Sequence, residues 1–186
     1  MSGKLQPWTV RGSKHVLRDR WISVRADDCV TPAGVEISPF YVLEYPDWVN
    51  IVALDEEDHM ILVREYRHGL GRITLGMPAG GIEPGEAVLD AGARELLEET
   101  GYGNAHQLSL VASLSSNAVS HTNFCHTVLA VNVSPAGAQN LDLTEAIEVV
   151  RVPYREALNL ALSGAMASPS VASLVLGLQA AKKISL

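Results

Sequence analysis

The chain has 186 residues, 47% of them hydrophobic and 5% aromatic, which suits one globular domain with a short additional segment. Its formal net charge of -7 argues against a general nucleic-acid-binding protein, because such a protein needs a basic surface to neutralise phosphates. No apolar run has membrane-spanning length and the first residues lack the apolar stretch of a signal peptide, so we expect a cytoplasmic protein without a membrane partner.

The two cysteines, Cys29 and Cys125, lie far apart in the sequence, and neither belongs to a CxxC pair. Zinc sites and secreted disulfide frameworks need closely spaced or numerous cysteines. The sequence therefore predicts two reduced thiols.

The N-terminal part of the chain is predicted to form strands separated by turns. β-branched and aromatic residues indicate strands at residues 16–24 and 35–43. Thr31-Pro32-Ala33-Gly34 is typical of the turn between them.

The rest of the chain mixes strands and helices without a regular βαβ repeat. Ser168 and Pro169 are typical of a helix start, as cap and first helical residue. The expected order favours an α/β fold in which helices flank a mixed sheet. We expect strands at residues 48–54, 59–66, 73–75, 108–114, 125–133 and 147–152, and helices at residues 86–100, 154–162 and 169–182.

The first predicted helix carries three glutamates on one face. Glu98 and Glu99 follow Glu95 by three and four residues, and side chains at these spacings are neighbours on a helix. Like charges at these spacings destabilise a helix by about 0.2–0.5 kcal/mol per pair, which suggests a functional site. The face expected to enter the core lies opposite and carries Leu89, Ala93, Leu96 and Leu97.

Carboxylates grouped in this way suit Mg2+ or Mn2+, which prefer hard oxygen ligands. A solvated acidic helix face is the alternative, and it would be favoured for an isolated EXXEE pattern. Here the helix follows residues 78–85, whose glycines allow the backbone to approach a ligand closely. This context favours a metal site.

The whole stretch GGIEPGEAVLDAGARELLEETGY, residues 80–102, resembles the Nudix box G-x5-E-x7-R-E-U-x-E-E-x-G-U, where U is a bulky aliphatic residue. Only Tyr102, at the last position, departs from the pattern. The matching residues are Gly80, Glu86, Arg94, Glu95, Leu96, Glu98, Glu99 and Gly101.

The resemblance implies the Nudix α/β/α sandwich, preceded by an N-terminal antiparallel β segment at residues 1–45. The Nudix domain itself would cover residues 46–186. In the family, glutamates of the box bind divalent cations that bridge the enzyme and a substrate pyrophosphate. That role is carried over to Glu95, Glu98 and Glu99, with the carbonyl of Ala79 as a further ligand. Glu86 is expected to stabilise the junction of loop and helix, and Arg94 to orient Glu95 or a phosphate.

Pyrophosphate hydrolysis also needs a base that removes a proton from the attacking water. In Nudix enzymes that resemble ADP-ribose hydrolases, this base often lies on a loop outside the box. Residues 142–145 occupy the matching region. The resemblance favours Glu145 as a fourth ligand or base, with Asp142 next and box residue Glu98 as the third choice, while a polar loop without catalytic function is the alternative.

The run ILVREYRHGLGRITLGMPAGG resembles the region before the box in ADP-ribose and nucleotide-sugar pyrophosphatases. The resemblance implies that Arg67 contacts the substrate phosphate, with Arg64 as a second candidate. The alternative for each is a surface arginine at a strand end.

In the same subgroup, N-terminal strands are commonly exchanged in a homodimer whose aromatic residues hold the nucleobase. Trp48 is one candidate for stacking on the base, beside the alternative of packing in the sheet or dimer interface. His121 is a candidate for contact with the distal sugar or phosphate, beside the alternative of an exposed loop histidine. The other aromatic candidates for stacking on a base are Trp8, Trp21 and Tyr45.

The resemblance implies a metal-dependent hydrolase of nucleoside diphosphate sugars, of ADP-ribose or GDP-mannose type. The loop at residues 120–123 lacks the Pro-Gly that is usual in ADP-ribose enzymes, which weakens strict ADP-ribose specificity. A nucleoside triphosphate sanitising pyrophosphatase is one alternative, although such enzymes usually lack the N-terminal strands. A non-catalytic Nudix module that senses nucleotides is another, although such modules often have eroded boxes.

Overall fold

The computed structural model describes residues 4–185, which divide into two compact units. The smaller unit contains the residues up to Pro46 together with Ser115–Asn123. The larger unit contains Asp47–Leu114 and the residues from Phe124 onward. Because the placement of one unit relative to the other is not determined, each is described separately.

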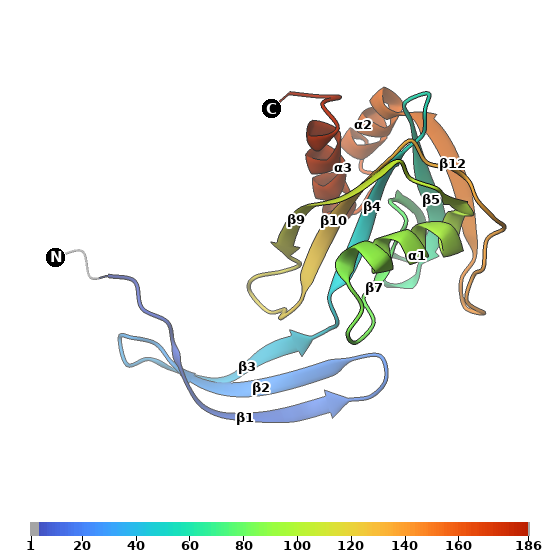
Figure 1. The fold of residues 1–186 in the computed structure, drawn as a ribbon. Helices are drawn as coiled ribbons and strands as arrows, with labels where there is room; N and C mark the ends of the chain where they lie inside the picture. The colour runs from blue at the N-terminus through green and yellow to red at the C-terminus, as the bar shows by residue number, and fades with distance from the viewer. Residues whose placement is uncertain (1–3, 186) are drawn as a thin grey trace. The chain divides into compact units, whose positions relative to one another are not determined.

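The smaller unit is a three-stranded antiparallel sheet in the order β1-β2-β3 (Figure 1). Its strands are β1 (Thr9–Arg18), β2 (Ser23–Val30) and β3 (Glu36–Glu44). The segment Ser115–Asn123 joins the end of β3, since Leu43 N–H donates to Ser120 O and Thr122 N–H donates to Leu43 O.

The predicted strand at residues 16–24 is wrong, because a turn divides it. Asp19 Oδ1 accepts hydrogen bonds from the backbone N–H groups of Trp21 and Ile22, at 2.7 and 3.0 Å. An aspartate side chain that bonds the backbone two or three residues later stabilises a turn. The chain therefore reverses at this aspartate and forms β1 and β2 on either side.

The larger unit contains a seven-stranded mixed sheet with the path β12-β5-β4-β10-β9, in which β6 pairs with β5 and β7 with β4. The sheet is mixed because β10 runs parallel to β4, whereas β5, β6, β7 and β12 pair antiparallel with their neighbours. Its strands are β4 (Trp48–Leu54), β5 (His59–Arg67), β6 (Arg72–Gly76), β7 (Ala79–Gly81), β9 (Gln107–Ser115), β10 (Phe124–Val131) and β12 (Ile147–Pro153). A separate short pair joins β8 (Tyr102–Gly103) to β11 (Ser134–Pro135).

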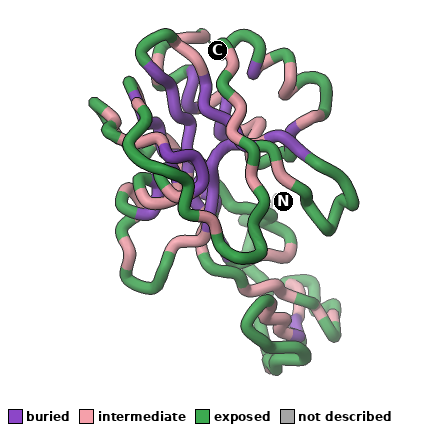
Figure 2. The backbone as a smooth tube through the Cα atoms, turned by 90° about the vertical axis from the view of Figure 1, so that its right-hand side faces the viewer, coloured by how far each residue is buried: buried purple, intermediate pink, exposed green. Residues whose placement is uncertain are grey.

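Helices cover both faces of this sheet and bury one apolar cluster on each. Helix α1 (Val88–Thr100) packs on the face that carries Ile51 and Ile61. Helices α2 (Tyr154–Leu162) and α3 (Ser168–Ala180) pack on the face that carries Val52 and Leu62. The buried residues lie mainly in the central strands (Figure 2). The predicted α/β sandwich with a mixed sheet and preceding antiparallel strands is confirmed.

Most strand and helix positions agree with the sequence-based prediction within two residues, but the region after β5 is more regular than predicted. Besides the predicted short strand, it contains a 3-10 helix (His68–Leu70) and β7, which pairs with β4. Ser168 is the first residue of α3 rather than its cap, and the capping position, Ala167, makes no side-chain hydrogen bond.

The predicted inner face of α1 is also partly wrong. Leu97 is 40% exposed and Ala93 is exposed, whereas Ala91 and Gly92 are buried. A Cβ at Gly92 would lie 3.3 Å from Val128 of β10, so the small residue lets the helix approach the sheet. The helix therefore turns the side next to its glutamates toward the sheet.

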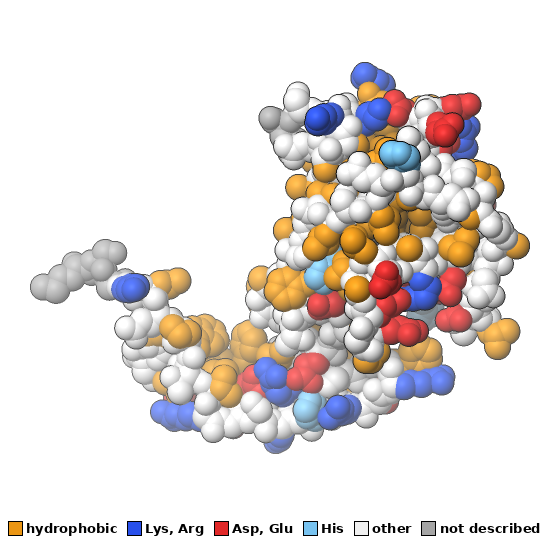
Figure 3. All heavy atoms as spheres, in the orientation of Figure 1, with side chains coloured by type: hydrophobic (Ala, Val, Ile, Leu, Met, Phe, Trp, Pro, Cys, Tyr) orange, Lys and Arg blue, Asp and Glu red, His pale blue; other side chains and the backbone are white. Residues whose placement is uncertain are grey.

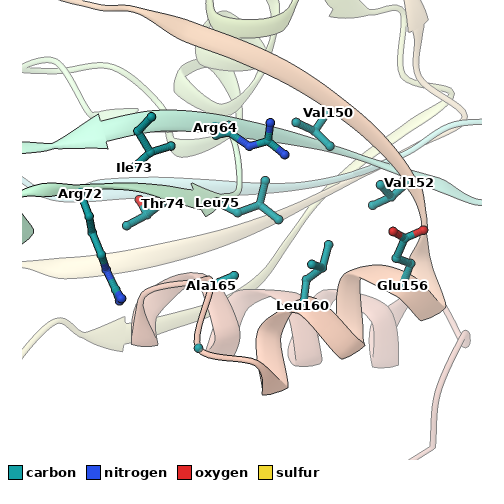
Figure 4. A pocket seen from close by; sticks show the side chains of 11 residues that line it. Arg64, Arg72, Ile73, Thr74, Leu75, Val150, Val152, Glu156, Leu160 and Ala165 are labelled. Carbon is teal, nitrogen blue, oxygen red and sulfur yellow. The ribbon is translucent and has the colours of Figure 1, made fainter.

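A hollow of about 280 Å3, referred to below as the second hollow, lies on the face of the sheet that α2 and α3 cover, between β5, β6, β12 and α2 (Figure 4). Arg64 lines it from β5, and Arg72 and Glu156 lie at its two ends. Among residues 4–185, no helix combines the length and apolar character needed to cross a membrane.

Candidate active site

The candidate site begins at β7, whose three residues lead into the loop before α1. Strand β7 pairs with β4 in the register Trp48↔Gly81 and Asn50↔Ala79, which fixes the start of this loop against the sheet. The helix ends at Gly101, as predicted, because this glycine has a positive φ of 72° and its N–H donates to Leu97 O. The glutamates thus lie on a helix that follows an anchored loop and ends at a fixed residue.

Arg94 is the centre of a hydrogen-bond network between loop and helix. Its guanidinium binds Glu86 in a bidentate manner, at 2.8 and 3.0 Å, and donates to Gly81 O at 3.1 Å. It also donates to Glu95 Oε1 at 2.7 Å and to Glu98 Oε2 at 3.1 Å. The pKa of Glu86 is lowered to about 2, mainly by the hydrogen bond from Arg94. The expectation that Glu86 stabilises the junction of loop and helix agrees with these contacts.

Gly80 lies directly against the carboxylate of Glu95. A Cβ added at this position would lie 2.1 Å from Glu95 Cδ and Oε1, far inside van der Waals contact. Any residue other than glycine would therefore displace the carboxylate. The first glycine of the motif is explained by this close approach between β7 and α1.

Glu99 is the most deeply buried carboxylate of the helix, at 5% exposure. Its Oε2 accepts a 2.9 Å hydrogen bond from Ala79 N–H. Burial raises its pKa to about 8, opposed by the Ala79 N–H and reinforced by the charges of Glu65, Glu95 and Glu145. The structure thus holds a carboxylate whose charge lacks a full counter-charge.

Several segments converge on one pocket of about 330 Å3 in the larger unit. The box residues lie on α1 and β7, Glu65 and Arg67 on β5, and Asp142 and Glu145 on the loop before β12. Acidic side chains gather beside α1, with basic side chains among them (Figure 3). The pocket is lined by Trp48, Glu65, Arg67, Ala79, Gly80, Gly81, Glu83, Arg94, Glu95, Glu98, Glu99, Asn140, Asp142 and Glu145.

Glu65 is a site residue that the sequence analysis missed. Burial raises its pKa, the charge of Arg67 opposes this shift and the charge of Glu145 adds to it. Its side chain forms an ion pair with Arg67. Residues two apart on a strand point to the same face, so Glu65 could have been found from the expectation for Arg67.

Asp142 and Glu145 close a turn in the loop before β12. Its Oε2 accepts the N–H of Asp142 at 3.0 Å, and its own N–H donates to Asp142 O at 2.9 Å. Both residues are exposed and line the pocket. The structure therefore brings the two candidate bases to the box glutamates.

The box carboxylates are bonded to Arg94 and Ala79 but retain oxygens that a cation could use. In residues 4–185 as they stand, no three His, Cys, Asp or Glu side chains form a group that could hold a metal ion. Arg94 is bonded to Glu95 and Glu98 instead. One carboxylate oxygen of each of Glu95, Glu98 and Glu99 nevertheless has no hydrogen bond to the described residues.

Some predicted substrate-binding residues lie elsewhere. Trp48 and Arg67 line the pocket, whereas Arg64 faces the second hollow and pairs with Glu148 at 3.1 Å. Successive strand residues alternate between faces, so Arg64 and Arg67 point to opposite sides of β5. His121 lies in the smaller unit, where its ring stacks on Tyr45 with a centroid distance of 5.6 Å.

Comparison with known proteins identifies the fold. A model of the NUDIX domain matches residues 44–172, which is more than half of the chain. The chain belongs to the Nudix family. A second model, the nucleoside diphosphate sugar hydrolase N-terminal domain, matches residues 8–43 and thus the strands that precede the Nudix domain.

Several Nudix relatives align over most of their length. The chain is 33% identical over 163 residues to the ADP compounds hydrolase NudE of Escherichia coli, covering 86% of this chain and 85% of that protein. It is 29% identical over 148 residues to an ADP-ribose pyrophosphatase of Bacillus subtilis, covering 79% of each. It is also 27% identical over 157 residues to a methanol dehydrogenase activator of Bacillus methanolicus, covering 84% of each. The crystal structure of an ADP compounds hydrolase superposes with a TM-score of 0.82 at 29% identity, covering 98% of each chain.

Proposed function

We propose that this Nudix protein hydrolyses the pyrophosphate bond of nucleoside diphosphate sugars and related ADP compounds, with ADP-ribose as the leading substrate. The products are a nucleoside monophosphate and a sugar phosphate. The observation that carries the proposal is the pocket itself, in which carboxylates from α1, β5 and the loop before β12 meet Arg67. The relatives named as ADP compounds hydrolase and ADP-ribose pyrophosphatase support this substrate class.

The donor set fits a divalent cation, with Mg2+ expected and Mn2+ as a substitute. All donors are oxygens, which these cations prefer over nitrogen or sulfur. Burial, together with the nearby charges of Glu65, Glu95 and Glu145, raises the pKa of Glu99 to about 8, so a cation beside it would favour the ionised carboxylate. The proposed ligands are Glu95, Glu98 and Glu99 with the Ala79 carbonyl.

When bound, the cation neutralises the pyrophosphate oxygens and lowers the pKa of a coordinated water. The chain's residues perform the remaining tasks. Arg94 holds Glu95 and Glu98 in position from the loop side, and Gly80 leaves the space that the Glu95 carboxylate occupies. Arg67 is proposed to bind a phosphate, and Glu145 or Asp142 to accept the proton of the attacking water.

A substrate panel tests the proposal. Purified protein is incubated with Mg2+ and ADP-ribose, GDP-mannose or a nucleoside triphosphate. For the nucleotide sugars, phosphate is measured after treatment with alkaline phosphatase, which does not attack the intact substrates. For the triphosphate, which alkaline phosphatase does attack, the released pyrophosphate is measured with inorganic pyrophosphatase instead. We expect ADP-ribose to be cleaved fastest. EDTA should stop the cleavage, as measured by chromatography of the nucleotides, because EDTA also inhibits alkaline phosphatase.

Other outcomes identify the two alternative functions. Faster cleavage of nucleoside triphosphates than of any nucleotide sugar would indicate a sanitising pyrophosphatase. No cleavage of any pyrophosphate, together with a rise in melting temperature on adding nucleotide, would indicate a sensing module. Either result contradicts the proposed activity.

We also propose that the protein is a homodimer joined through the three-stranded sheet. The three-stranded sheet exposes several large apolar side chains, and exposed apolar side chains that gather on a surface mark an interaction site. Sedimentation of the full chain should give twice the chain mass, and a monomer at micromolar concentration would refute the proposal. The exposed apolar residues of the smaller unit include Trp8, Val10, Val16, Leu17, Trp21 and Tyr41.

A further inference from the structure

The C-terminal end of α1 is bonded to the loop that carries the two candidate bases. The last carbonyls of a helix have no partner within the helix and must be satisfied from outside. Glu98 O accepts the N–H of Asn140 at 2.9 Å, and Glu99 O accepts Gln139 Nε2 at 2.6 Å. Just beyond the helix, Gly101 O accepts the N–H groups of Ala136 and Gly137, at 2.8 and 3.1 Å.

Gln139 differs from the other partners because it uses its side chain. The same Nε2 also donates to Ile147 O at 3.3 Å, and Ile147 is the first residue of β12. One amide group thus ties the end of α1 to the start of β12. The segment from Gln139 to Ile147 contains Asp142 and Glu145.

We infer that Gln139 is a positioning residue that holds the loop with Asp142 and Glu145 over the carboxylates of α1. The inference rests on the proposed function for its catalytic consequence. Gln139 does not line the pocket, so it acts through the loop rather than on the substrate. The intrinsic turn between Asp142 and Glu145 fixes the two residues relative to each other, whereas Gln139, beside the backbone bond from Asn140 N–H to Glu98 O, fixes the turn relative to α1.

Three variants isolate this role. Gln139→Met keeps a similar length and volume but removes both donors. Gln139→Lys restores donors that suit carbonyls at a helix C-terminus, where a positive charge is favourable. Gln179→Met, at an exposed position of α3, is the matched control for the same chemical change.

We expect Gln139→Met to lower kcat about fivefold to tenfold, mainly through loss of the short hydrogen bond to Glu99 O, with KM changed less than about twofold. Gln139→Lys should recover most of the loss, and Gln179→Met should behave as the unmodified chain. If Gln139 acts through the loop, its effect disappears in a background that already lacks the base, Glu145→Gln or Asp142→Asn. Effects that multiply in both backgrounds would overturn the inference.

Hydrogen–deuterium exchange provides a readout that does not depend on turnover. Amides of residues 137–146 should exchange faster in Gln139→Met than in the unmodified chain, while amides of β4 and β5 should not change. Unchanged exchange in the loop would overturn the inference even if the enzyme is active. Absence of turnover with every pyrophosphate, together with faster loop exchange, would refute the proposed function but leave the positioning role supported.

Discussion

The backbone N–H of Ala79 donates to the buried carboxylate of Glu99 across 2.9 Å, and this bond joins β7 to α1 at the floor of the pocket. Replacement Glu99→Gln keeps a carbonyl oxygen that can accept the same N–H, so the fold should persist. Loss of the charged ligand should lower kcat by more than about a hundredfold, above the range for partners that only support a metal ligand.

The Glu99 variant is checked by substrate cleavage in Mg2+ and by thermal melting. Glu156→Gln is the matched control, because Glu156 is an exposed glutamate on the opposite face of the sheet. Near-normal turnover of Glu99→Gln would contradict its assignment as a ligand.

The stability of metal-free protein should fall as pH rises from about 4.5 to about 8. Burial raises the pKa of Glu99 from 4.5 in the unfolded chain to about 8 in the fold. Within this interval the folded state binds a proton that the unfolded state has lost, so raising the pH favours unfolding. Burial also raises the pKa values of Glu65 and Glu95, and both shifts act in the same direction.

Thermal melting in EDTA across this pH range measures the effect. Glu99→Gln should make the dependence shallower, because one titrating group is gone and only Glu65 and Glu95 remain. Mg2+ should stabilise the protein more at pH 8 than at pH 5, since it binds the ionised carboxylate. Equal stabilisation at both pH values would argue against cation binding by this group.

Gly80→Ala should disable the site without unfolding the protein. The new Cβ would overlap the Glu95 carboxylate, which Arg94 holds in place. Overpacking of this kind costs about 1–3 kcal/mol, and moving Glu95 removes a proposed ligand. Gly69→Ala is the matched control, because a Cβ there meets no atom within 4 Å and Gly69 does not line the pocket. The prediction fails if both variants retain the same turnover.

Arg94→Lys should lower both activity and stability, although it preserves the charge. A lysine cannot reproduce the planar fork that contacts Glu86, Glu95 and Gly81 O together. We expect a melting temperature several degrees lower and a loss of turnover larger than for Arg72→Lys. Arg72 forms no ion pair among residues 4–185, so it controls for the chemical change.

Glu65 and Arg67 should be energetically coupled. Arg67→Ala leaves the largely buried Glu65 without its partner, and an unpaired carboxylate destabilises the fold. Adding Glu65→Gln should therefore raise the melting temperature of Arg67→Ala. The double variant should still show a raised KM, because the proposed phosphate contact remains absent. Additive melting shifts would show that the pair contributes no coupling.

The box was predictable because a short local pattern fixes both the helix and the spacing of its carboxylates. Glu95, Glu98 and Glu99 lie three and four residues apart, and only a helix brings such side chains to one face. Which side of that helix meets the sheet was not predictable in the same way. Gly92 packs on Val128, a contact between segments far apart in the sequence, and it leaves Leu97 exposed.

Residues outside the box depend on long-range strand pairing. The alternation of side chains along β5 predicts that Glu65 and Arg67 share a face and that Arg64 lies on the other. Alternation alone does not say which of the two faces meets the pocket. The turn at Asp19 was missed because the residues around it are β-branched and aromatic. Such residues favour strands unless a side chain bonds the backbone as Asp19 does.

The attachment of the Glu145 loop to the end of α1 affects which part of the sequence can change without disturbing the fold. The Gln139 side chain bonds the main-chain carbonyls of Glu99 and Ile147, so this attachment requires no particular side chain between Gln139 and Ile147. A different base can therefore be presented to the pocket by changing one short exposed segment. Helix α1, which carries the proposed metal ligands, would remain unchanged. Residues 140–146 are therefore a natural target for directed evolution.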